Sequence, residues 1–255
     1  MQSQGSSELI AALDLPASSR VDQRVPKKLL LENGAPTAAD KRLINDGIEE
    51  LLWLAALKPT TIGVPEYRDE VREYLEIAVL RLTLRAKAKS TRLVELVHRA
   101  VPYPVLLLTE QGESPGLSAA HKRWSQGEAG KTVLEGEVVG AEWDATHDDE
   151  RWPAFRDTLA LGKQSRTTLY ALYQGWIDTL IALQAARVTG AFAVAANAEH
   201  AALRHDALQE CARLDAEIAR LRAAATKEKQ MSRRVELNLE LKRVEAAQAA
   251  ARAKL

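Results

Sequence analysis

Residues Tyr74–Arg85 read YLEIAVLRLTLR, and this stretch decides the fold class. The apolar side chains of Ala78, Leu80, Leu82 and Leu84 recur at every second position, which places them on one face of an extended chain. The positions between them place Ile77, Val79, Arg81, Thr83 and Arg85 on the opposite face. The stretch therefore predicts a β-strand, around which the neighbouring segments can be interpreted.

The segments that follow this strand predict one helix and three more strands. Lys89–Val101 is amphipathic and predicts a helix, which Pro102-Tyr103-Pro104 ends because proline cannot continue a helix. Short apolar or alternating runs then predict strands at Val105–Thr109, Leu117–Trp124 and Thr132–Glu142. Because turns rather than helices join most of these strands, we expect an α+β fold with a largely antiparallel sheet.

The residues before the strand predict a long helix behind a weakly ordered start. Residues 1–20 are rich in small and polar side chains, so we expect them to be disordered or weakly ordered. Thr37 and Asp40 have the spacing of a short capping box, and the apolar residues after them predict a helix over 38–56 that Pro59 ends. Together with the sheet, these segments define an α+β domain over residues 21–156.

The remaining residues, 157–255, predict a helical region that ends in a coiled-coil-like helical hairpin over 206–255. No residue from Asp206 to Leu255 is Gly or Pro, and the apolar residues recur at steps of three and four. Such a seam must be buried, so we expect it, together with the basic bend between its two arms, to bind a partner. The predicted partner-binding residues are Leu214, Ile218, Leu221, Arg233, Arg234, Leu237 and Leu241.

Composition narrows the class of protein. The chain has 35 basic and 35 acidic residues, and this balance favours neither a nucleic-acid coat protein nor an acidic tail. Its single cysteine, Cys211, excludes an internal disulfide and a cysteine-based zinc site. The first residues do not resemble a signal peptide, and no apolar run approaches the roughly 20 residues of a membrane span. We therefore expect a cytoplasmic protein that does not contact a membrane.

Local charge suggests a surface for DNA. Basic residues gather at the end of the predicted strand, along the next helix and on a later strand, where they could contact phosphates without reading sequence. The alternatives are a solvated basic face or contact with an acidic protein surface. The candidate nucleic-acid-binding residues are Arg81, Arg85, Lys87, Lys89, Arg92, Lys122 and Arg123.

The chain shows no motif that would indicate catalysis. Glycine-rich phosphate loops and nucleophile elbows are absent, and the five histidines do not have the spacing of a zinc-binding helix. Glu76, Glu113 and Lys122 resemble parts of a metal-dependent nuclease, but no acid stands two positions before Lys122. The sequence predicts no catalytic residue, cofactor or metal site, and a degenerate nuclease remains an alternative.

Residues 229–243 read KQMSRRVELNLELKR, and RVPK at 24–27 and AVPYP at 100–104 lie upstream. With these motifs the chain, from about Val21 onward, resembles the bacterial family called domain of unknown function 4391 (DUF4391). The positions that match residues typical of that family are Arg24, Pro26, Trp53, Pro102, Lys122, Gln230, Arg234, Glu236 and Asn238.

The resemblance implies a partner rather than a reaction. The family has no agreed active site, and its members tend to be encoded beside helicase and DNA-methyltransferase genes in bacterial defence loci. The leading hypothesis is therefore a non-catalytic accessory subunit of a DNA-targeting system that docks onto a helicase or DNA methyltransferase, with non-specific DNA nearby. A structural homodimer is the remaining alternative beside the nuclease.

Overall fold

The computed structural model describes residues 4–128, 130–142 and 151–255, which form two compact units that divide after Leu180. This division lies later than the predicted boundary after residue 156. The reason is that Phe155 and Trp176 are fully buried, and the Trp176 indole N–H donates to the Leu159 carbonyl at 2.9 Å. The segment from 157 to 180 therefore belongs to the first unit.

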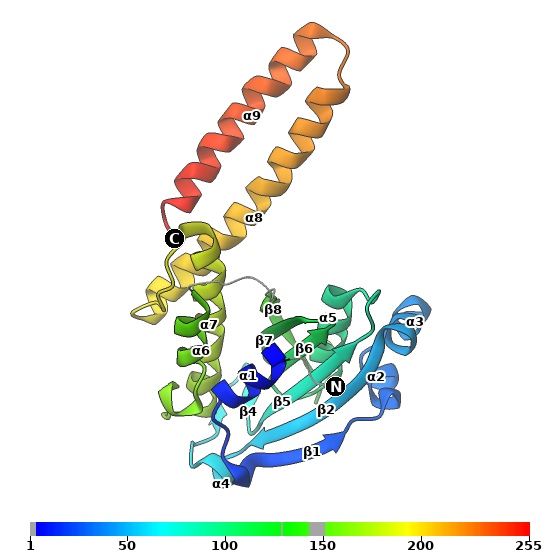
Figure 1. Cartoon of the computed structure of the whole chain (residues 1–255), viewed down its shortest axis with the longest axis vertical. Helices are drawn as coiled ribbons and strands as arrows, with labels where there is room; N and C mark the ends of the chain where they lie inside the picture. Colours follow the sequence, from blue (N-terminus) through cyan, green and yellow to red (C-terminus); the bar gives the residue numbers. More distant parts are fainter. Residues whose placement is uncertain (1–3, 129, 143–150) are drawn as a thin grey trace. The chain divides into compact units, whose positions relative to one another are not determined.

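The first unit contains a six-stranded sheet, a two-stranded ribbon and several helices (Figure 1). The strands are β1 (Arg20–Arg24), β2 (Ile48–Leu57), β3 (Tyr67–Arg68), β4 (Glu73–Tyr74), β5 (Ile77–Leu84), β6 (Val105–Gln111), β7 (Ser114–Trp124) and β8 (Thr132–Glu142). The helices are α1 (Gln4–Ala12), η1 (Ala17–Ser19), α2 (Lys27–Asn33), α3 (Ala38–Gly47), α4 (Pro59–Ile62), α5 (Ser90–Ala100), α6 (Arg151–Thr158), η2 (Leu161–Lys163) and the first half of α7 (Leu169–Thr189).

The large sheet has the order β1-β2-β5-β6-β7-β8. Its neighbours pair antiparallel except β5 and β6, which are parallel and joined by α5. This topology confirms the predicted α+β class and the largely antiparallel sheet. The two edge strands are irregular: β1 contains a register shift with Asp22 at φ 49°, and β7 and β8 shift register near Gly136, at φ 73°.

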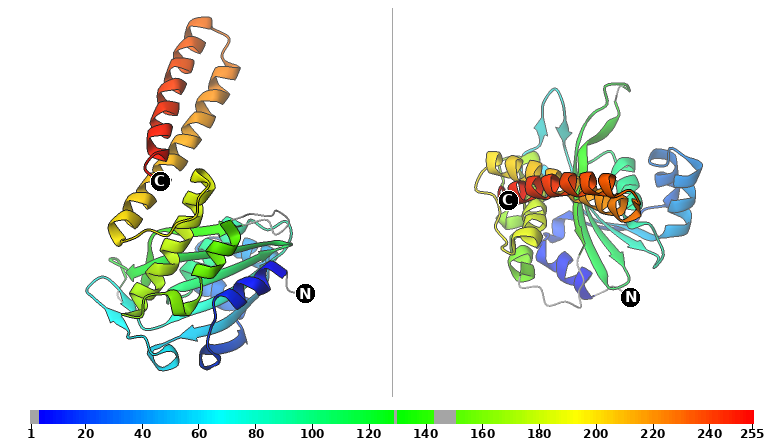
Figure 2. Two further views of the ribbon diagram at one scale, coloured as in Figure 1. Left: turned by 60° about the vertical axis from the view of Figure 1, so that its left-hand side comes forward. Right: turned by 90° about the horizontal axis from the view of Figure 1, so that it is seen from above.

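Helices cover both faces of the sheet (Figures 1 and 2). On one face, the predicted alternation of β5 is confirmed, because Ala78, Leu80, Leu82 and Leu84 all join the core beneath α2, α3 and α5. On the other face lie α1 and the first half of α7, whose Tyr173 hydroxyl donates to the Val105 carbonyl at 2.7 Å. Both faces of the central strands are therefore buried.

The predicted helix over 38–56 is only half correct. Thr37 caps α3 as expected, because its hydroxyl oxygen accepts the Asp40 backbone N–H at 3.1 Å. The helix ends at Gly47, and residues 48–57 form β2 between β1 and β5. Tertiary pairing on both sides thus overrides the helix propensity of a segment rich in Glu, Leu and Ala.

The expectation of a weakly ordered start is also wrong. Residues 4–12 form α1, and Leu9 and Leu13 have 1% and 0% of their surface exposed. The Leu13 carbonyl accepts the Leu161 backbone N–H at 2.9 Å, and Glu8 pairs with Arg156 at 2.8 Å. These contacts hold the N-terminal helix in the first unit.

The second unit consists of the end of α7 together with α8 (Ala198–Lys227) and α9 (Met231–Arg252). The two long helices run antiparallel and side by side (Figure 1). Asn197 caps α8, because its side-chain oxygen accepts the His200 backbone N–H at 2.9 Å. Apolar residues of the predicted seam meet between the helices, with Leu214 packing near Ala251, and Leu221 near Leu237.

Among the residues described, no helix is both long and apolar enough to cross a membrane.

Candidate functional site

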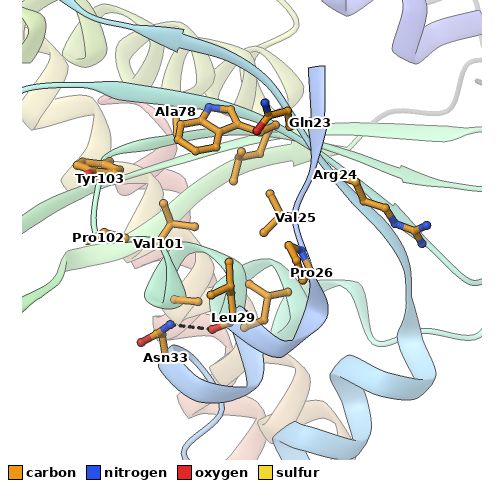
Figure 3. A pocket seen from close by; sticks show the side chains of 14 residues that line it. Gln23, Arg24, Val25, Pro26, Leu29, Asn33, Ala78, Val101, Pro102 and Tyr103 are labelled. Carbon is orange, nitrogen blue, oxygen red and sulfur yellow. Dashed lines mark hydrogen bonds between the residues drawn. The ribbon is translucent and has the colours of Figure 1, made fainter. Parts of the chain in front are cut away.

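An open pocket of the first unit lies between α2, the end of α5 and the sheet (Figure 3). Its volume is about 370 Å³, which lies in the range of pockets that hold a small ligand or a large side chain. Mostly apolar side chains line it, including Val25, Leu29, Leu30, Trp53, Leu80, Val101, Pro102 and Tyr103.

The connection between β1 and α2 forms one wall of the pocket. The Val25 backbone N–H donates to the Leu51 carbonyl at 2.8 Å, which ties this connection to β2. Pro26 then restricts the backbone and precedes the first turn of α2. The Trp53 indole N–H donates to the Ala55 carbonyl at 2.9 Å, so the ring is fixed and its polar atom is satisfied.

Lys122 on β7 supports the opposite wall from beneath. Its ammonium donates to the carbonyls of His98 and Val101, the latter at 2.7 Å, where the last turn of α5 leaves carbonyls without helical partners. Only 1% of Lys122 is exposed, and burial lowers the pKa of its ammonium to about 8. Lys122 therefore fixes the backbone that leads into Pro102 and Tyr103.

The rim of the pocket leaves large apolar side chains in water. Leu29 is 48% exposed and Tyr103 is 38% exposed. Arg24 lines the rim but extends away from the pocket, toward Glu50, with which it forms a 3.8 Å ion pair (Figure 3). The pocket is thus suited to an apolar or aromatic group, because its interior offers little to a charged one.

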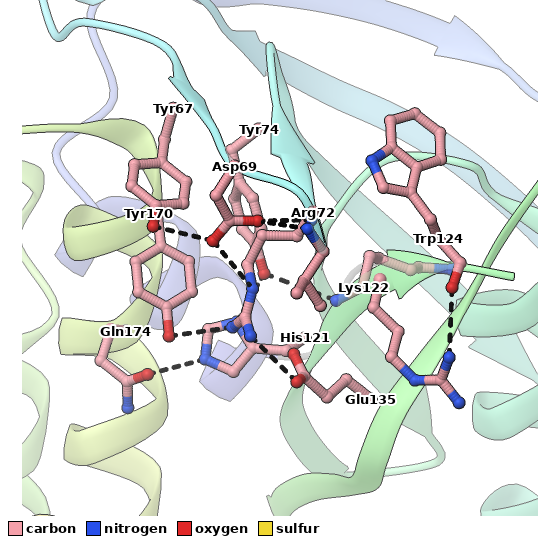
Figure 4. A network of polar contacts seen from close by, with 12 residues as sticks. Tyr67, Asp69, Arg72, Tyr74, His121, Lys122, Trp124, Glu135, Tyr170 and Gln174 are labelled. Carbon is pink, nitrogen blue, oxygen red and sulfur yellow. Dashed lines mark hydrogen bonds and ion pairs between the residues drawn. The ribbon is translucent and has the colours of Figure 1, made fainter. Parts of the chain in front are cut away.

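A network of polar and aromatic residues lies on the other face of the sheet (Figure 4). The Tyr74 hydroxyl donates to His121 Nδ1 at 2.5 Å, and His121 Nε2 donates to Gln174 Oε1 at 2.7 Å. Gln174 in turn donates to Asp178 at 2.8 Å. Arg72 extends the network, because it donates to the Tyr170 hydroxyl at 3.1 Å and to Glu135 at 3.0 Å.

The geometry of this network indicates a structural role. Tyr74 is fully buried, and burial raises the pKa of its hydroxyl, so it neither ionises at neutral pH nor meets a substrate. Burial also lowers the pKa of His121 to about 4, which keeps the imidazole neutral. The network connects β4, β7 and β8 with the first half of α7 and holds that helix on the sheet.

The structure does not bring the seven candidate nucleic-acid-binding residues onto one surface. Arg81 is 7% exposed and lies 3.7 Å from Glu50, and Lys122 is buried, so neither can contact a phosphate. Arg92 pairs with two carboxylates, those of Asp40 and Glu95, at 2.9 and 2.7 Å. Arg123 is half-buried and donates to the Trp124 carbonyl. The exposed candidates are Arg85, Lys87 and Lys89, in and beside the turn after β5.

The residues of the nuclease alternative do not form a cluster. Glu76 is buried and pairs with Lys58 at 2.9 Å, whereas the Lys122 ammonium contacts backbone carbonyls. Glu113 is exposed in the turn between β6 and β7. Within residues 4–128, 130–142 and 151–255, no three His, Cys, Asp or Glu side chains are arranged to hold a metal ion.

The predicted partner-binding seam is used within the chain. Four of its residues are buried and Leu241 is half-buried, so they are not available to a partner. Arg233 and Arg234 are exposed at the start of α9, where Arg233 pairs with Glu236 at 2.6 Å. The four buried residues are Leu214, Ile218, Leu221 and Leu237.

Positions that match residues typical of the family fall in two places. Arg24, Pro26, Trp53 and Pro102 line the pocket, and Lys122 supports its wall. The other four lie in the second unit, just before and within the first turns of α9. These are Gln230, Arg234, Glu236 and Asn238.

Comparison of the chain with curated proteins and with solved structures gives no match. Comparison with family models gives the model described as "Domain of unknown function (DUF4391)", which matches residues 13–247. This range includes the strands of both sheets, all the pocket residues and most of α9. The chain therefore belongs to the DUF4391 family.

Proposed function

We propose that this chain is a non-catalytic accessory subunit of a bacterial DNA-targeting system, and that it holds a helicase or DNA-methyltransferase partner through the pocket. In this proposal an apolar or aromatic side chain of the partner enters between α2 and the end of α5. The observation that carries the proposal is the open apolar pocket whose rim exposes Leu29 and Tyr103.

Two physical arguments support a protein partner. First, a buried anchor side chain contributes about 1.5–3 kcal/mol through removal of apolar surface from water, and a few such anchors dominate most interfaces. Second, the pocket walls are preorganised: the Trp53 ring and the Val101 carbonyl are both held by hydrogen bonds. A preformed pocket loses little conformational entropy when it binds.

The choice of a helicase or methyltransferase comes from the family, whose members tend to be encoded beside such genes. Arg85, Lys87 and Lys89 are exposed and would add weak contacts to DNA held by the partner. In the second unit we propose that α8 and α9 pack as a coiled coil along the seam that contains Leu214 and Leu221.

Co-expression with a helicase and with a DNA methyltransferase from the same bacterium tests the proposal. We expect a stable complex that Leu29→Glu disrupts, because the new carboxylate would lie at the mouth of an apolar pocket. Leu203→Glu is the matched control: Leu203 is 57% exposed on α8, outside the pocket, and its complex should persist. The proposal fails if neither protein binds, or if Leu29→Glu binds as well as the wild-type chain.

A further inference from the structure

Helix α9 carries a second row of apolar side chains. Met231, Val235 and Leu239 are 65%, 51% and 55% exposed, and their spacing of four places them on one side of the helix. Leu237 and Leu241 pack toward α8, and about 200° of helical rotation separates Leu237 from Val235. The helix is therefore apolar on two opposite sides, of which α8 covers one.

The exposed row continues beyond these three residues. Lys242 and Ala246 follow on the same side, and both are exposed. The methylene stem of a lysine packs on apolar surface while its ammonium reaches water, so Lys242 does not interrupt the row. A continuous exposed row of this kind marks a surface that another helix can cover.

Charged residues on one flank of the row are self-complementary. Glu236 and Arg243 lie seven residues apart, which is close to two turns, and both are exposed. Within the chain Glu236 contacts only the exposed Arg233, and Arg243 has no ion-pair partner among the described residues. Arg243 is therefore available to an opposite charge on a facing helix, and Glu236 can meet one by exchanging its exposed contact with Arg233.

We infer that this row is the dimer surface of the protein and that its occupant is α9 of a second copy, running antiparallel. In that register Val235 meets Ala246 of the second copy, and Leu239 meets the stem of Lys242. Glu236 then faces Arg243 of the second copy, and symmetry forms this pair twice. The two α8–α9 pairs together make a four-helix bundle.

The charges favour this arrangement over the other possibilities. A parallel pairing would bring the two Lys242 ammonium groups together and would leave Glu236 away from Arg243. A different protein would need its own matching charges, whereas the pattern on α9 complements itself. Such an interface is independent of the pocket, so the dimer and the proposed partner can be tested separately.

Sedimentation of the purified full chain tests the inference. We expect a species of twice the 28.0 kDa chain mass that dissociates on dilution. The Val235→Glu, Leu239→Glu double variant should be monomeric with unchanged helical circular dichroism, because both positions are exposed. Leu203→Glu should remain dimeric. A wild-type chain that is monomeric at every concentration, or a double variant that still dimerises, would overturn the inference.

A charge exchange tests the antiparallel register. Glu236→Arg alone and Arg243→Glu alone each place like charges opposite one another, so each should weaken the dimer roughly tenfold. The two substitutions together restore opposite charges and should restore dimerisation. If the combined variant dimerises no better than either single variant, these two residues do not face each other and the antiparallel register is wrong.

Discussion

Lys122 is a buried cation that holds the carbonyls at the end of α5, next to the pocket. A cation near the end of a helix stabilises the last carbonyls, yet burial of that cation has a cost in free energy. The sequence does not reveal that Lys122 is buried, because Lys122 stands beside Arg123 and the pattern predicts both as surface cations. The register of β7 shifts between Ala119 and His121, and only the structure shows that Lys122 then points into the core.

Lys122 should make the free energy of unfolding change with pH in the alkaline range. Burial lowers its pKa from 10.5 to about 8, so above pH 8 the folded state loses a proton that the unfolded state keeps. The free energy of unfolding should therefore rise between about pH 8 and about pH 9.5, by up to roughly 2 kcal/mol. Urea unfolding at several pH values measures this rise, and Lys122→Met should abolish it.

The neighbouring Arg123→Met variant is the control, since Arg123 is only half-buried and should leave the rise intact. The range stops below pH 10 because the buried tyrosines Tyr74 and Tyr173 then begin to act in the opposite direction. Persistence of the rise in Lys122→Met would assign it to another group.

Strand β2 marks the limit of what the sequence could predict. Segments with a clear period, such as β5 and α5, were predicted nearly to their ends. The sequence predicts β2 as a continuation of α3, because its Glu, Leu and Ala residues favour a helix and its partners β1 and β5 are distant in sequence. With Trp53 assigned to a helix, the pocket that Trp53 shares with Val25 and Val101 could not be foreseen.

The packing of α2 on α5 should depend on Gly34. A Cβ atom there would lie 2.6 Å from Ala100 Cβ and 2.7 Å from the Leu96 carbonyl oxygen, and this oxygen belongs to a helix that cannot easily move. Gly34→Ala should therefore lower the free energy of unfolding by about 1–3 kcal/mol and displace a wall of the pocket.

Thermal or urea unfolding measures the loss. Gly127→Ala is the matched control, because nothing lies within 4 Å of the added atom and the stability should stay within about 0.5 kcal/mol. Equal stability of Gly34→Ala and the wild-type chain would mean that α2 and α5 can separate without cost.

The molecule as a whole presents its two candidate surfaces on different units. The pocket belongs to the first unit, and the exposed row of α9 belongs to the second. The sequence pattern located the helical pair but assigned its buried seam to a partner, because a seam that must be covered looks the same whether α8 or another chain covers it. The outer row was missed because one helix rarely carries two apolar sides.

DNA binding by the isolated chain should be weak and sensitive to salt. Of the predicted cations, Arg85, Lys87 and Lys89 are exposed, so two or three phosphate contacts give a slope of log affinity against log salt of about −2 to −3. Their combined replacement by alanine should flatten the slope in a fluorescence anisotropy titration. Lys163→Ala, which removes an exposed cation of η2 outside this turn, should not change the slope. A slope unaffected by the triple variant would mean that the turn after β5 does not contact DNA.

The irregular edges of the large sheet bear on how the protein behaves at high concentration. A regular edge strand can recruit the same strand of another molecule without limit, and this is a common route to fibrils. Here Asp22, at φ 49°, distorts β1, and Gly136, at φ 73°, lies in β8 where its pairing with β7 is broken. Both ends of the sheet are thus poor templates for further strands. Strand addition at these edges is therefore disfavoured, and we expect concentrated solutions of this chain not to form fibrils through the sheet.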